Sequence, residues 1–383
     1  MRDGKMRAKL EDFLQEVCEK TITNNQYPVL TSSKSGLFLQ SDYFNKQVAS
    51  KDNTGYKIIR RGQFTYRAMS DTGKFFPNML ECADVGIVSP AYPVFEIIKQ
   101  DQIVPEYLNY YFKSNRFQNS ISTFAQGSTR TSVKFGKLKK VSIELPEIKK
   151  QYQIIRTLDL LRTIINNRKK EVLELDELIR ARFVEMFGDP RTNPNNFEVE
   201  ELRSSCTVIT GNTPSRSVEE YYGNYIEWIK TDNIVLGRTN PTQAVECLSE
   251  EGMKVGRIVD EDAILMACIA GSIASIGRVC ITDRKVAFNQ QINAVIPKHY
   301  DVSFLYVLLQ ISKDYLVEEI NMALKGILSK SKLEGKVFYV PPMDEQKTFA
   351  DFVKQIDKSK ATVQKALDET QLLFDSLMQQ YFG

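Results

Sequence analysis

The sequence predicts an α+β protein in which two globular α/β domains are separated by two long antiparallel coiled-coil helices, with a pseudo-twofold internal repeat. One long amphipathic helix occurs twice, 195 positions apart, and each copy follows a segment in which short strands precede a short helix. The chain therefore divides into a domain at 1–145, a helix at 146–188, a domain at 189–340 and a helix at 341–383.

In each globular segment, short runs of β-branched residues bounded by glycine or proline predict strands, and an apolar periodic run then predicts a helix. In the first segment we expect strands at 56–62, 85–88 and 93–98 and a helix at 104–112. In the second we expect strands at 257–259, 263–266, 277–281 and 293–296 and a helix at 302–309. A basic loop rich in Gly and Ser/Thr precedes each long helix, at 126–134 and 324–332.

Both long helices carry an apolar seam with the 4-3 spacing of a coiled coil. The apolar seam residues are Ile154, Leu158, Leu161, Ile165, Val172, Leu175 and Ile179 in the first copy, and Phe349, Val353, Ile356, Val363, Leu367, Phe374 and Leu377 in the second. Pro146 and Gln151 of the first copy match Pro341 and Gln346 of the second. Because each seam needs a partner, we expect the two helices to pair as a spacer of roughly 60 Å.

The first long helix is predicted to end at Gly188, which can adopt the left-handed cap conformation, before Pro190, which cannot continue a helix. Residues 188–196 are rich in turn-forming residues and read as a linker.

The composition is that of a soluble globular protein, with 42% hydrophobic and 26% charged residues. No apolar run has the length of a membrane span and the N-terminus lacks the apolar core of a signal peptide, so we expect a cytoplasmic protein. The six cysteines form no Cys-x-x-Cys pair, which argues against a zinc site or a disulfide framework, and we expect buried thiols.

Positive charge is concentrated in the first globular segment. Residues 1–146 hold 21 basic and 14 acidic side chains, whereas residues 191–340 hold 16 and 19. A basic domain favours binding to a polyanion through phosphate contacts.

No catalytic motif is found in the sequence. It contains no phosphate-binding Gly-x4-Gly-Lys-Ser/Thr loop, no Gly-x-Ser-x-Gly elbow, no His-Glu-x-x-His and no good match to the Asp/Asn-Pro-Pro-aromatic motif of adenine methyltransferases. The single histidine, His299, is expected in a solvent-facing loop. The glycine-spaced turn at 271–277 lacks the dinucleotide-binding pattern and reads as a tight strand connection.

The remaining candidate chemistry is nucleic-acid binding, because Arg and Lys contact phosphates or guanine edges and Asn and Gln pair with adenine. The candidates in the first domain are Arg60, Arg61, Tyr66, Arg130 and Lys134. Those in the second domain are Arg216, Lys230, Asn233, Asn289, Gln290, Gln291, Lys325, Lys330 and Lys332.

At this point the sequence resembles a known family, the specificity subunits of type I restriction-modification enzymes. The similarity rests on the string 145–151 leading into a heptad helix that ends at 183–189, on the second copy of that helix, and on the strings 211–215, 226–233 and 288–291. The strings Thr-Pro-Ser and Trp-Ile are absent from the first domain, so the resemblance is weaker there.

The resemblance implies a non-catalytic subunit that binds double-stranded DNA through two target-recognition domains. Each domain would read one half of a bipartite target, and the helices would set the gap between the halves. The implied partners are two methyltransferase subunits and two endonuclease/translocase subunits. From the antiparallel helix pair we predict that the methyltransferase subunits dock on the outer faces of the helices and the adjoining domain surfaces. S-adenosylmethionine, ATP and magnesium would bind those partners.

Three alternatives stay open at the level of sequence. The chain can be the specificity subunit of a related multi-subunit restriction enzyme with a different cleavage arrangement. It can also be a coiled-coil adaptor that binds no DNA, or a free-standing nuclease or methyltransferase with unrecognised motifs.

Overall fold

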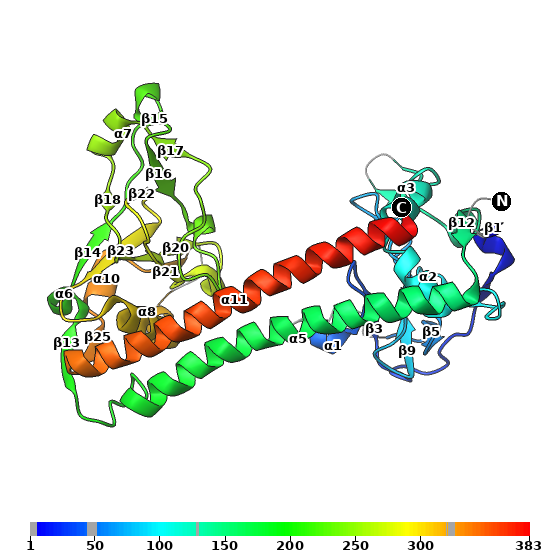
Figure 1. Cartoon of the computed structure of the whole chain (residues 1–383), viewed down its shortest axis with the longest axis horizontal. Coiled ribbons are helices and arrows are strands. Elements are labelled where there is room, and N and C mark those ends of the chain that lie inside the picture. The colour runs from blue at the N-terminus through cyan, green and yellow to red at the C-terminus, as the bar shows by residue number, and fades with distance from the viewer. Residues whose placement is uncertain (1–5, 44–51, 128–129, 319, 321–325) are drawn as a thin grey trace. The chain divides into compact units, whose positions relative to one another are not determined.

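The computed structural model describes residues 6–43, 52–127, 130–318, 320 and 326–383 (Figure 1). The chain forms two compact units. Unit 1 comprises Met1–Lys169 and Lys365–Gly383, and unit 2 comprises Lys170–Gln364. Each unit therefore contains one globular domain and one part of each long helix.

The domain of unit 1 is built on a four-stranded sheet in the order β2-β10-β6-β8, with two-stranded pairs β1-β12, β3-β4, β5-β9 and β7-β11 around it. Its elements are β1 (Met6–Lys9), η1 (Leu10–Asp12), β2 (Leu14–Val17), β3 (Leu30–Ser32), β4 (Leu37–Leu39), α1 (Gln40–Tyr43), β5 (Lys57–Arg60), β6 (Phe64–Thr65), β7 (Met69–Ser70), β8 (Asn78–Met79), β9 (Val85–Val88), β10 (Val94–Ile97), α2 (Pro105–Tyr111), α3 (Asn115–Ser122), β11 (Thr131–Ser132), α4 (Phe135–Leu138) and β12 (Ser142–Leu145).

The domain of unit 2 has a four-stranded sheet in the order β14-β23-β19-β21, a five-stranded sheet in the order β15-β17-β16-β22-β18, and the pairs β13-β25 and β20-β24. Its elements are β13 (Glu198–Glu201), α6 (Leu202–Ser205), β14 (Cys206–Thr210), η2 (Glu219–Tyr221), β15 (Tyr222–Gly223), β16 (Ile226–Ile229), η3 (Thr231–Asn233), β17 (Cys247–Leu248), α7 (Glu250–Val255), β18 (Ile258–Val259), β19 (Ile264–Ala267), β20 (Ile269–Ala270), η4 (Ile273–Ser275), β21 (Val279–Ile281), β22 (Val286–Phe288), β23 (Ile292–Pro297), α8 (Val302–Ile311), α9 (Lys313–Val317), β24 (Gly326–Ile327), α10 (Lys330–Glu334) and β25 (Val337–Val340).

The strand pairing of unit 1 recurs in unit 2, which confirms the internal repeat. The pairs β1-β12 and β13-β25 are equivalent, as are β7-β11 and β20-β24 and the sheets β2-β10-β6-β8 and β14-β23-β19-β21. The antiparallel pair β5-β9 corresponds to β18-β22. The strands and the short helices expected from the sequence are present at these positions.

The long helices α5 (Ile148–Phe187) and α11 (Met343–Phe382) each contain 40 residues, and their bounds differ by the repeat offset at both ends. All fourteen predicted seam residues are buried or half-buried. In unit 1, Ile154 and Leu158 of α5 share a core with Phe374 and Leu377 of α11.

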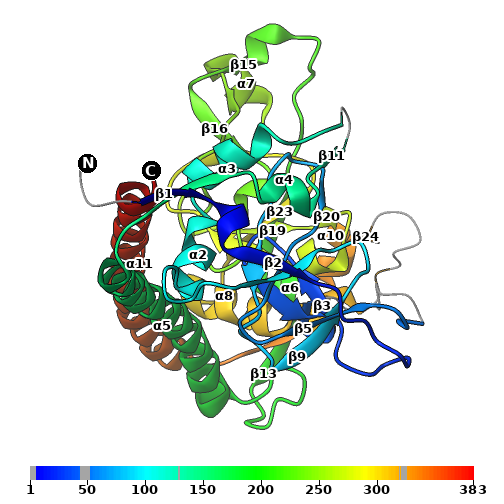
Figure 2. The same ribbon diagram turned by 90° about the vertical axis from the view of Figure 1, so that its right-hand side faces the viewer.

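In unit 2 the opposite ends of the helices meet. Ile179 and Phe183 of α5 share a core with Phe349 and Val353 of α11, and the rings of Phe183 and Phe349 are 5.4 Å apart. Lys360 donates to Asp176 across the pair at 2.5 Å. Within each unit, the segments of α5 and α11 lie side by side (Figure 2) and run in opposite directions, as the sequence predicts.

Helix α5 ends where the sequence predicts. Gly188 has a φ of 74°, and a Cβ at this position would lie 2.1 Å from Pro194 Cγ. Both the left-handed conformation and the close approach require glycine.

The prediction of uniformly buried thiols is wrong for half of the cysteines. All six are free, and Cys206, Cys268 and Cys280 are buried. Cys18 and Cys82 are exposed and Cys247 is half-buried, because they lie at strand ends and loops rather than on the inner faces of sheets. Within the described parts of the chain, no helix is long and apolar enough to cross a membrane.

Candidate nucleic-acid interface

Three segments of unit 2 meet around the indole of Trp228, although they are far apart in the sequence. They are residues 211–215, 226–233 and 288–291. Trp228 Nε1 donates to the carbonyl of Asn212 at 3.3 Å, and strand β16 runs parallel to β22 with Trp228 opposite Ala287. The amide of Asn212 donates to the Phe288 carbonyl. A Cβ on Gly211 would lie 2.1 Å from the Asn289 carbonyl oxygen, so only glycine permits this approach.

Two of the predicted DNA-contacting cations lie on the rim of this cluster. The Arg216 guanidinium stacks over Tyr222 and Trp228, at 4.5 and 5.1 Å from the ring centroids. Glu246 accepts hydrogen bonds from Lys230 at 2.5 Å and from Arg216 at 2.7 Å. These two bonds hold the pKa of Glu246 below its ordinary value, so it stays ionised at neutral pH.

The predicted amides of unit 2 divide into buried and exposed groups. Asn233 is buried, where its Oδ1 accepts from the Lys230 amide at 2.9 Å, and Asn289 is buried and accepts from the Gln291 amide. Both side chains hold loops in place. Gln291 is half-buried, whereas Gln290 is exposed and accepts a hydrogen bond from the Thr213 hydroxyl at the surface.

For Asn233 and Asn289, the predicted direct contact with a base is therefore corrected to a supporting role. Their side-chain amides form hydrogen bonds within the protein, because a buried polar group needs such partners.

The second predicted basic loop lies at the pair β20-β24. Lys330 forms an ion pair with Glu334 at 3.5 Å, and Lys332 is exposed. Lys325 lies outside the described residues.

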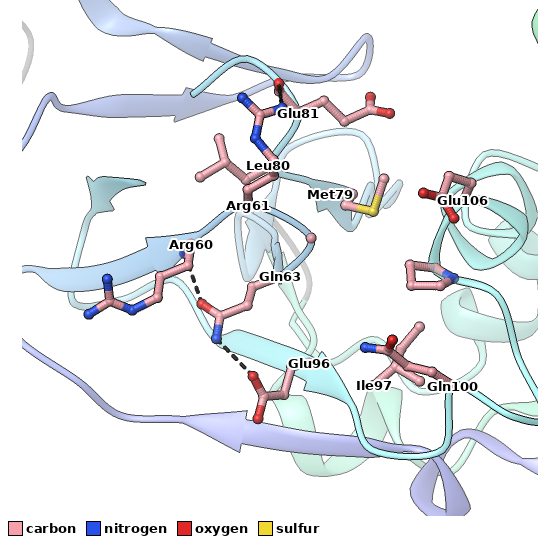
Figure 3. A pocket seen from close by; sticks show the side chains of 12 residues that line it. Arg60, Arg61, Gln63, Met79, Leu80, Glu81, Glu96, Ile97, Gln100 and Glu106 are labelled. Carbon is pink, nitrogen blue, oxygen red and sulfur yellow. Dashed lines mark hydrogen bonds between the residues drawn. The ribbon is translucent and has the colours of Figure 1, made fainter. Parts of the chain in front are cut away.

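In unit 1, Arg60 and Arg61 line a pocket of about 700 Å³ at the end of β5 (Figure 3). Arg60 donates to Glu19 at 2.7 Å and Arg61 donates to Asp84 at 2.8 Å. The same pocket is lined by three carboxylates, Glu81, Glu96 and Glu106. Its walls therefore carry more acidic than basic groups, which disfavours a polyanion.

The prediction that Tyr66 contacts DNA is corrected by its position. The side chain is fully buried, and its hydroxyl donates to the Val133 carbonyl at 2.9 Å. Burial raises the pKa of the hydroxyl well above its ordinary value. The ring of Tyr66 instead completes the core beside Phe95.

A more basic pocket of about 230 Å³ lies next to the first predicted loop. We call it the basic pocket. It is lined by three cations, one carboxylate and four hydroxyls, together with two apolar side chains: Lys34, Arg67, Lys74, Asp71, Ser32, Ser33, Ser70, Thr72, Met69 and Phe76. The pair β7-β11 brings the loop to the pocket, with Thr131 opposite Ser70.

The predicted cation Arg130 joins the basic pocket through Asp71, to which it donates at 2.8 Å. Arg67 forms an ion pair with the same carboxylate at 3.7 Å. Lys134 is exposed at the start of α4. Sequence reasoning missed Lys34, Arg67 and Lys74, because a tertiary strand pair, and not a local motif, brings them to the loop.

A family model described as the type I restriction modification DNA specificity domain matches residues 11–175 and 194–370. The chain belongs to this family. The two matched regions correspond to the two structural repeats, so each repeat is one specificity domain with its adjoining helix.

One curated relative is similar over most of the chain, and another is similar over a shorter part. The chain is 26% identical over 369 residues to the type I restriction enzyme MjaIX specificity subunit of Methanocaldococcus jannaschii, covering 85% of the chain and 82% of that protein. It is 29% identical over 150 residues to the HindI specificity subunit of Haemophilus influenzae, covering 38% of the chain and 32% of that protein.

Solved structures share the fold at low sequence identity. The crystal structure of the type I restriction-modification S subunit from M. genitalium has a TM-score of 0.57 at 14% identity, covering 100% of the chain and 97% of that structure. A structure from a study of complex assembly and conformational transition of the type I system has a TM-score of 0.58 at 16% identity, covering 99% and 97%.

Both specificity domains thus present cations whose ion pairs lie at the surface. Exposed pairs contribute only about 0–1 kcal/mol each, so exchanging a carboxylate for a phosphate costs the fold little. Among the residues that the structure describes, no group of three or more His, Cys, Asp or Glu side chains could hold a metal ion.

Proposed function

We propose that this chain is the DNA-recognition subunit of a type I restriction-modification complex that reads a bipartite DNA target. The observation that carries the proposal is the duplication of a DNA specificity domain within one chain. Two readers joined by paired helices are suited to two short sequences at a fixed gap, because sites on one face of DNA recur about every 34–36 Å.

The surface groups named above would make the contacts with DNA. In unit 2, Thr213, Arg216, Lys230 and Gln290 supply donors and acceptors around the Trp228 cluster. In unit 1 the basic pocket supplies cations and hydroxyls that suit phosphate oxygens. Arg216, which lies over two aromatic rings, is the residue best placed for bidentate contact with guanine.

The reactions would take place on partner subunits. In this proposal two methyltransferase subunits use S-adenosylmethionine to modify adenine, and two endonuclease/translocase subunits use ATP and magnesium. The outer faces of the helices carry large exposed apolar side chains, among them Leu160 and Leu173 of α5 and Leu372 of α11, and these support docking of the methyltransferase subunits there.

The direct test is to co-express the chain with its neighbouring methyltransferase subunit in a host that lacks adenine methylation, and to sequence the genome with detection of modified adenine. We expect one split motif, two short defined halves around a fixed unspecified gap. A continuous motif, or no modification from a purified complex of both proteins, would contradict the proposal and favour the adaptor.

A further inference from the structure

One glutamine in each repeat is fully buried at the beginning of the long helix, although glutamine is usually exposed. In unit 1, Gln151 Oε1 accepts from the Val104 amide at 2.9 Å. Its Nε2 donates to the carbonyls of Gln102 and Pro146, both at 2.9 Å. The side chain thus joins α5 to the loop that leads into α2.

Gln346 repeats this arrangement in unit 2. Its Oε1 accepts from the Asp301 amide at 2.9 Å, and its Nε2 donates to the carbonyls of His299 at 3.2 Å and Pro341 at 2.8 Å. His299 and Asp301 precede α8, as Gln102 and Val104 precede α2. Pro341 precedes α11, as Pro146 precedes α5. The same three backbone contacts therefore occur twice in one chain, and the two glutamines are separated by the repeat offset.

Each amide is a three-point clamp between a long helix and its domain. Apolar packing of α5 and α11 on the two cores fixes their position, but it is non-directional and leaves the angle between helix and domain less well defined. Hydrogen bonds to three backbone groups on two segments restrict that angle, since each bond loses strength when its geometry changes.

A small change in this angle is large at the far end of the helix. A helix of 40 residues is about 60 Å long, so a tilt of roughly 3° moves its end by about 3 Å, close to one base-pair step. A clamp at each helix start is therefore placed to control which gap in the DNA is accepted.

We propose that Gln151 and Gln346 are positioning residues that set the gap between the two half-sites. They touch no DNA and act through the angle at which each helix leaves its domain. This inference rests on the proposed bipartite recognition, and it assigns one part of that recognition, the gap, to two buried amides.

The test uses the full chain in complex with its methyltransferase subunit. The variants are Gln151→Met, Gln346→Met and the double variant, because methionine fills a similar volume without the hydrogen bonds. Matched controls are Gln153→Met and Gln355→Met, which lie on the same helices with exposed side chains. Methylation rates are measured on duplexes that contain both native halves at the native gap and at gaps one and two base pairs shorter or longer.

We expect the preference for the native gap over a gap changed by one base pair to fall about tenfold in the double variant, the size expected for about 1.4 kcal/mol. The preference for the two half-sequences should stay as in the unmodified chain, and both controls should keep the full gap preference. Should the double variant not fold, the two single variants carry the same test at one helix start each.

An equal loss of methylation at every gap would show that the amides only stabilise the fold, and it would overturn the inference. So would an unchanged gap preference in folded variants. No split motif from the unmodified chain would overturn the proposed function itself, which separates the two failures.

Discussion

At the scale of single residues, the candidate interface consists of Lys and Arg side chains that form ion pairs with Asp and Glu at the surface. Lys230 and Arg216 share Glu246, and Arg67 and Arg130 share Asp71. Ion pairs at the surface contribute only a small free energy, so they hold these side chains weakly. Each cation can therefore exchange its carboxylate for a phosphate at little cost to the fold.

Replacing Arg67 and Lys74 by alanine should weaken DNA binding and reduce its salt dependence. Each lost phosphate contact lowers the slope of log affinity against log salt by about 1. Fluorescence anisotropy at several salt concentrations measures this slope. Arg61→Ala in the acidic pocket serves as the comparison, and an equal effect of Arg61→Ala would contradict the assignment to the basic pocket.

The buried thiols predict an alkaline limit to stability. Burial raises the pKa of Cys268 from its ordinary value near 9 to about 12. Between pH 9 and 12 the unfolded chain loses this proton while the folded chain keeps it, so the free energy of unfolding falls as pH rises, by at most about 1.4 kcal/mol per pH unit for each thiol.

Urea denaturation at pH 8 and pH 10 measures this fall, and Cys268→Ala should make it smaller. A variant that loses stability as steeply as the unmodified chain would show that Cys268 does not contribute.

At the scale of elements, the long helices were predictable because a 4-3 apolar spacing persists through each of them. The short strands of the domains were also predictable, since β-branched runs between glycine and proline give a local signal. The residues of the candidate DNA interface were less predictable than the helices and strands. Tyr66 and Asn289 have side chains typical of DNA contacts, and only the packing of the domain shows that they lie inside it.

The basic pocket could not be predicted, because Lys34, Arg67 and Arg130 come from separate segments. A hairpin, the strand β7 and its pairing with β11 bring them together. The spacing of basic residues along the sequence does not indicate such a cluster. The Trp228 cluster was partly predictable, since its three strings resemble family motifs, but their meeting around one indole was not.

The seam of the helix pair gives a stability prediction. Leu158→Ala should lower the free energy of unfolding by about 2–5 kcal/mol, because the side chain is 0% exposed and its loss leaves a cavity. Leu160→Ala, two positions away and 61% exposed, should change it by less than about 0.5 kcal/mol. Thermal and urea denaturation compare the two, and similar losses would refute the predicted seam.

At the scale of the whole molecule, the boundaries between the two units fall at equivalent positions of the repeat. One lies after Lys169 in α5 and the other after Gln364 in α11, and these positions are separated by the same 195 residues as the helices themselves. Both helices can therefore be lengthened at matched points without cutting into either domain.

Inserting one heptad after Lys169 and one after Gln364 should change the accepted gap and leave both half-sequences unchanged. Seven residues add about 10 Å to each helix, about three base-pair steps. Sequencing of modified adenine in the co-expression host reads the motif directly. A heptad in α5 alone breaks the match between the two seams and should prevent assembly of the complex.

The constant offset between the helices also has a genetic meaning. A recombination event between the two helix-coding stretches would join codon 169 to codon 365, or codon 364 to codon 170, in frame and with the heptad register intact. A domain can thus be lost or duplicated without a change of reading frame or of heptad register. The repeat offset therefore makes a whole domain, and not only a single residue, a unit that one genetic event can change.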